Sequence, residues 1–152
     1  MRHAVLYGLL FLLVGPVQAQ RRQCPDVRHV RALVRQLDDP HYRIRKKADS
    51  QLRLLGEAAL PLVRAELRRT QSLEVYRRLE RIVEYLSIPQ QIRALVADLG
   101  DNTFIIREQA DRRLRSFGKR ILPLLKRELA RSTDVGVRVH LIDIIKDFSK
   151  GK

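Results

Sequence analysis

The chain has few of the residues that build disulfide frameworks or aromatic sites. It contains no tryptophan and one cysteine, and aromatic residues make up only 5% of it. A single cysteine excludes a disulfide within the chain. Cys24 is therefore interpreted as an incidental residue, with a free thiol or a disulfide to another chain as alternatives. The abundance of Leu, Arg, Ala and Glu favours helix, and we expect an all-α fold.

Long apolar runs are also scarce, and the only one extends from Ala4 to Val14, after a short basic start. Gly15-Pro16 ends it, and Ala19 follows closely. This arrangement is typical of a secretory signal peptide, predicted over residues 1–19. A retained anchor is the alternative, but the run is short for a bilayer core, which needs about 20 residues. We expect an exported, periplasmic or secreted, mature chain without an integral membrane span.

Acidic residues are in the minority: 31 Lys and Arg stand against 17 Asp and Glu, for a net charge of +14. Such a charge implies affinity for nucleic acid, acidic lipid or an acidic protein face. The acidic residues are scattered among the basic ones. An ordinary solvated, arginine-rich surface therefore stays open as the other interpretation.

The clearest feature that is present is a duplication. Val30 to Leu67 lies over Ile92 to Leu129 after a shift of 62 residues. Two of the matched segments are Arg31-Ala32-Leu33-Val34 with Arg93-Ala94-Leu95-Val96, and Leu60-Pro61-Leu62 with Leu122-Pro123-Leu124. A repeat of this kind indicates an architecture of stacked units.

Apolar spacing predicts helices, with Asp26 and Ser72 as N-caps, Gly56 and Gly118 as stops, and Pro89 opening the second round. Eight helices are expected, over residues 26–37, 41–55, 58–69, 73–87, 89–99, 103–117, 120–131 and 134–148. Short linkers force antiparallel neighbours, so we expect a right-handed α-solenoid segment of about four helical hairpins. The expected parts are a polar lead-in at 20–25, a domain at 26–149 with units at about 30–91 and 92–149, and a tail at 150–152.

One segment carries a family resemblance. Asp39-Pro40-His41-Tyr42-Arg43-Ile44-Arg45, followed by Ala48, Leu52 and Gly56, recurs as Asp101 to Arg107 with Ala110, Leu114 and Gly118. This pattern resembles the short bacterial HEAT-like repeats of the PBS-lyase type. The resemblance implies a partner-binding module, although some relatives are lyase-related and some act on DNA. No catalytic motif of those enzymes can be placed on a residue here.

The repeated Asp and Arg of these turns are interpreted as a structural ladder. Asp39 and Asp101 precede helix starts, where a carboxylate caps free N–H groups. Arg45 and Arg107, six residues further on, are expected to reach the turn of their own or the next hairpin. A catalytic carboxylate is the remote alternative.

No constellation in the sequence selects a reaction. His29, His41 and His140 have no second histidine or cysteine at helical spacing, and no glycine-rich phosphate loop is present. Glu66 and Glu128 recur at equivalent positions and are expected to pair with arginines of adjacent helices. We therefore expect no catalytic, cofactor or metal site, and a protein that is not an enzyme.

Basic residues, some of them repeated, are the candidate binding surface. They fall on the helices that would line one face of the stack, and they are Arg31, Arg35, Arg64, Arg68, Arg93 and Lys126. Arg31 is equivalent to Arg93, and Arg64 to Lys126. Aromatic stacking partners are missing, so base-specific or single-strand recognition is unsupported.

The expected function is an exported protein-interaction or scaffold module without catalytic activity. The alternative is a binder of anionic polymers (nucleic acid, acidic lipid or polysaccharide) that uses the basic helical face.

Overall fold

The computed structural model describes residues 25–150, and the all-α expectation is confirmed for them. The expected signal peptide and Cys24 lie outside this range. The described elements are α1 (Val27–Gln36), α2 (Tyr42–Leu54), the 3₁₀ helix η1 (Glu57–Ala59), α3 (Leu60–Leu67), α4 (Leu73–Asp98), α5 (Phe104–Ser116), the 3₁₀ helix η2 (Gly118–Ile121), α6 (Leu122–Arg131) and α7 (Val135–Lys150). None of these helices combines the length and the apolar character that crossing a bilayer requires.

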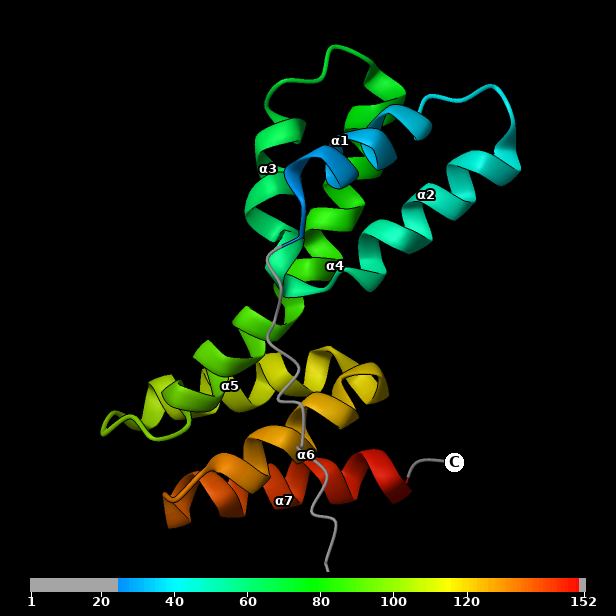
Figure 1. The fold of residues 1–152 in the computed structure, drawn as a ribbon. Coiled ribbons are helices and arrows are strands. Elements are labelled where there is room, and N and C mark those ends of the chain that lie inside the picture. The colour runs from blue at the N-terminus through cyan, green and yellow to red at the C-terminus, as the bar shows by residue number, and fades with distance from the viewer. Residues whose placement is uncertain (1–24, 151–152) are drawn as a thin grey trace, which may run out of the picture.

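The duplication is visible in the order of the helices. The first unit consists of α1, α2, α3 and the first half of α4, residues 73–88. The second unit consists of the second half of α4, residues 89–98, with α5, α6 and α7. In the first unit α1 packs beside α3 and α2 beside α4, and in the second α4 packs beside α6 and α5 beside α7. Each unit is therefore a two-layer arrangement of four helical segments (Figure 1).

Each unit has a core of its own. Apolar residues from Val30 to Leu86 form one buried cluster, and residues from Ile92 to Ile144 form the other. Equivalent positions are buried in both clusters, as in the pairs Val30 and Ile92, Leu33 and Leu95, Leu52 and Leu114, and Leu79 and Leu141. Burial of one such side chain stabilises a fold by about 1.5–3 kcal/mol. The repeated apolar pattern thus accounts for both cores.

The expected break before Pro89 is wrong. Helix α4 runs without interruption through Pro89, so the helices expected at 73–87 and 89–99 are one helix and form no hairpin. The other connections have turn residues, including Gly56 and Gly118 at φ +68°, whereas the junction reads Ser87-Ile88-Pro89-Gln90. Proline removes one helical hydrogen bond but does not by itself reverse a chain. In Figure 1 the second half of α4 veers away from the first as it enters the lower unit.

The side chain of Ser87 supports the helix at this junction. Its hydroxyl donates to the carbonyl of Glu84 at 2.8 Å and accepts from the side-chain amide of Gln91 at 2.9 Å. Ser87 is also the only polar residue buried in the described part of the chain. These two hydrogen bonds satisfy its hydroxyl where the helix lacks the N–H of Pro89. The expected four hairpins are thus replaced by two units that share one helix.

The predicted caps are confirmed. The carboxylate of Asp26 accepts from the backbone N–H of Arg28 at 2.9 Å, and the hydroxyl of Ser72 accepts from that of Val75 at 3.4 Å. Such caps satisfy N–H groups that have no partner within the helix.

The ladder residues make the same contacts in both units. Arg45 donates to the carbonyls of Asp39 and Pro40 at 2.7 and 2.8 Å, and Arg107 donates to those of Asp101 and Asn102 at 2.7 and 3.0 Å. Each arginine therefore holds the turn of its own unit.

The two turn carboxylates differ from the sequence prediction in one respect. Asp39 accepts from the N–H of His41 at 2.8 Å, and Asp101 accepts from that of Thr103 at 2.7 Å. His41 and Thr103 are themselves the N-cap residues, so the carboxylates fix the turn before the helix rather than the first helical turn. The predicted direct capping of α2 and α5 is corrected accordingly.

A buried charge should unfold either unit. Leu52 and Leu114 are fully buried, so Leu52→Asp or Leu114→Asp places a carboxylate in a core without a partner. We expect a loss of at least about 4 kcal/mol of unfolding free energy, measured by urea denaturation followed by circular dichroism. Leu54→Asp is the matched control, because Leu54 is 84% exposed and should tolerate the change. Equal stability of the Leu52 and Leu54 variants would contradict the assigned core.

Candidate binding site

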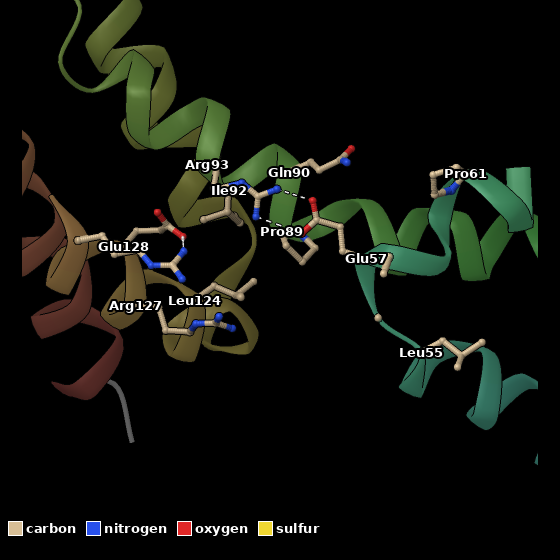
Figure 2. Close-up of a pocket in the computed structure, with 13 residues that line it drawn as sticks. Leu55, Glu57, Pro61, Pro89, Gln90, Ile92, Arg93, Leu124, Arg127 and Glu128 are labelled. Carbon is tan, nitrogen blue, oxygen red and sulfur yellow. Dashed lines mark hydrogen bonds and ion pairs between the residues drawn. The ribbon is translucent and has the colours of Figure 1, made fainter. Parts of the chain in front are cut away.

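A groove of about 780 Å³ lies where the two units meet. Its walls come from the segment around η1, from α4 just after the junction, and from α6 (Figure 2). The lining residues are Leu55, Gly56, Glu57, Ala58, Pro61, Pro89, Gln90, Ile92, Arg93, Leu124, Arg127, Glu128 and Arg131. The continuous α4 places its second half opposite η1, so the groove is a consequence of the unbroken helix.

An ion pair joins the two units across this groove. The guanidinium of Arg93 on α4 binds the carboxylate of Glu57 on η1 through two nitrogens, one of them at 3.1 Å. Figure 2 shows the two side chains reaching toward each other. The hydrogen bond to Glu57, followed by the charges of Glu57 and Glu128, raises the pKa of Arg93. A two-point pairing of this kind fixes the orientation of the guanidinium.

The α6 wall carries further charged side chains. The carboxylate of Glu128 forms an ion pair with the guanidinium of Arg131 at 3.6 Å. Arg127, in contrast, is exposed and has no ion pair among residues 25–150. In the first unit Glu66 pairs with Arg31 of α1 at 3.1 Å and with Arg69 at 3.5 Å. The expected pairing with an adjacent helix is thus confirmed for Glu66. Glu128 forms its ion pair within α6, and its charge also acts on Arg93 of the adjacent α4.

The structure divides the six candidate basic residues into two groups. Arg31 and Arg93 are engaged in ion pairs with Glu66 and Glu57, respectively. The remaining four are exposed and make no ion pair within the described residues, and they are Arg35, Arg64, Arg68 and Lys126. Of the six, only Arg93 lines the groove. The predicted equivalence of Arg31 and Arg93 therefore does not extend to their partners.

A smaller hollow of about 380 Å³ lies between α5 and α7. Its charged residues are mostly paired: Arg115 binds Asp111 at 2.6 Å and also binds Asp147. The hydrogen bonds that Arg115 donates to these two carboxylates raise its pKa. His140 also lines this hollow, and no group of three possible metal ligands occurs among residues 25–150.

The sequence indicated the basic helices but not the groove. Glu128 and Arg131 recur in the first unit as Glu66 and Arg69, so the repeat indicated them, whereas Glu57 and Arg127 do not recur. Glu57 is equivalent to Lys119, so its role cannot be found by looking for repeated residues. The groove also depends on the unbroken α4, which the sequence pattern did not predict.

Comparison of the chain with protein-family models, curated protein sequences and solved structures finds no match. The groove offers guanidinium donors, carboxylate acceptors and apolar side chains within one open hollow. Such a combination suits recognition of a polypeptide segment.

The ion pair between the units should contribute little to stability. Arg93 and Glu57 have side chains that are 42% and 27% exposed, and exposed pairs contribute about 0–1 kcal/mol. A double-mutant cycle with Arg93→Ala and Glu57→Ala, measured by urea denaturation, should give a coupling below about 1 kcal/mol. The coupling should fall further as salt is added. A coupling above about 2 kcal/mol would show instead that this pair holds the units together.

Proposed function

We propose that the chain is an exported helical-repeat module that binds or scaffolds other proteins and has no catalytic activity of its own. The observation that carries the proposal is the groove between the two units, which brings charged and apolar side chains from three segments into one hollow. Most repeated residues serve the cores and the turns. The groove, in contrast, presents side chains that are available for contact with a partner.

The proposal includes a HEAT-like α-solenoid segment behind a signal peptide. It is supported by the two-layer packing in each unit and by the matched contacts of Arg45 and Arg107. The unbroken α4 departs from the hairpin pattern of such repeats. Export is supported by the apolar run from Ala4 to Val14 and the small residue at Ala19.

A variant that fills the groove tests the proposal. Ala58 is exposed and lines the groove, so Ala58→Arg should obstruct it without disturbing a core. The mature chain should capture a defined set of proteins from the extracytoplasmic fraction, and Ala58→Arg should lose them in quantitative mass spectrometry. Leu54→Arg, at an exposed position outside the groove, should retain them. Capture of the same proteins by Ala58→Arg would contradict a binding role for the groove.

A second candidate function, binding of anionic polymers, is favoured by a separate observation. Arg35, Arg64, Arg68 and Lys126 are exposed cations without ion pairs in the described part of the chain. Cations that are not engaged within the protein are available to phosphate or sulfate groups.

Heparin chromatography distinguishes binding by a specific basic face from binding that depends only on net charge. Changing Arg64, Arg68 and Lys126 to Glu should lower the salt concentration needed for elution, because these residues would contact the polymer. Changing Arg43, Lys46 and Lys47 to Glu alters the net charge equally, at exposed positions of the other layer. The control triple variant should elute later than the first one. Elution of both at the same salt concentration would show that only net charge matters.

A further inference from the structure

The duplication separates the groove residues that the fold needs from those that it does not. Many residues of the cores and turns recur after 62 positions, as Gly56 does in Gly118. Two of the charged groove residues do not recur: Glu57 is matched by Lys119, and Arg127 by Ala65. The first unit folds with alanine where the second has Arg127, so this arginine is not required for the shared architecture. It is a surface feature particular to the second unit.

The arginines of the groove differ in their engagement. Arg93 is bound to Glu57 and Arg131 lies near Glu128, whereas Arg127 is exposed and makes no ion pair within residues 25–150. The existing pairs are partly exposed to solvent, and pairs near the surface contribute only about 0–1 kcal/mol. A carboxylate that enters the groove can therefore bind Arg127 directly. It can also bind Arg93 beside Glu57, or displace Glu57 from Arg93, at a small cost in free energy.

The remaining wall is apolar. Leu55 and Leu124 are half-buried at the edge of the groove, and Pro61 is exposed within it. Figure 2 shows Leu124 on the same helix as Arg127 and Glu128, with Leu55 and Pro61 on the other side. When a ligand covers apolar side chains that line an open hollow, it removes them from water, and this burial favours binding. The groove thus combines a free cation with apolar contacts.

We propose that the groove binds an acidic segment of a partner protein, with its carboxylates on Arg127 and Arg93 and its apolar side chains against Leu124 and Pro61. Charge complementarity selects this occupant, since the groove is lined by three arginines against two glutamates, together with an apolar wall. The inference rests on the proposed protein-binding function and adds the chemistry of the partner. An anionic polymer would use the charge but would leave the apolar wall uncovered.

Selection from a displayed library of random peptides tests this chemistry and requires no identified partner. Peptides retained by the mature chain should be enriched in Asp or Glu together with Leu, Ile or Phe. For an enriched peptide, fluorescence anisotropy should show that Arg127→Glu weakens binding by at least about tenfold. Lys126→Glu makes the same charge change on the neighbouring residue, which lies outside the groove, and should weaken binding by less than about threefold.

The outcomes separate the two levels of the proposal. Some peptides could bind only when Ala58 is unchanged. If these peptides are not acidic, or if Arg127→Glu does not weaken their binding, the proposal of an acidic ligand is overturned and the groove remains a binding site. Absence of any peptide that is sensitive to Ala58→Arg would overturn both. Equal weakening by Arg127→Glu and Lys126→Glu would indicate attraction by net charge alone and would also overturn the assigned contacts.

Discussion

The continuity of helix α4 is the constraint on which the rest of the structure depends. Because the chain does not turn at Pro89, the last helix of the first unit is also the first helix of the second. The buried cores remain separate, so the two units are joined by a continuous helix rather than by a shared buried core. The groove follows directly, since the second half of α4 faces η1 and α6 together. A turn at Pro89 would have moved this half of the helix away from Glu57.

The two units show how one architecture carries different surfaces. Arg53 lies over the ring of Tyr85 at 5.0 Å, whereas its equivalent, Arg115, binds Asp147 at the position equivalent to Tyr85. The same slot between helices is thus filled by a cation–π contact in one unit and by an ion pair in the other. Buried positions tolerate little change in volume, but exposed contacts of this kind exchange freely. Divergence after the duplication therefore accumulates where it costs least.

The sequence predicted the fold better than the site, and the reasons are physical. Helix positions, caps and cores follow from local spacing, so residues such as Asp26, Leu52 and Leu114 could be placed correctly. The course of the chain at Pro89 could not be predicted, because proline is compatible both with a first helical turn and with a kink inside a helix. The partner of Arg93 depends on that outcome. Its equivalence with Arg31 predicted a surface residue but could not indicate a contact with Glu57 of the other unit.

The partial solvent exposure of the pair between Arg93 and Glu57 is consistent with a binding role. A strongly bound carboxylate at this position would compete with any acidic ligand, because the same guanidinium nitrogens would be occupied. An exposed pair imposes only a small penalty on exchange and still orients Arg93 toward the groove before a ligand arrives. Arg127 then supplies a cation that no residue in the described part of the chain neutralises. Because α4 is continuous, the groove is already present without a ligand. Because the ion pair can exchange, the groove remains accessible to carboxylates.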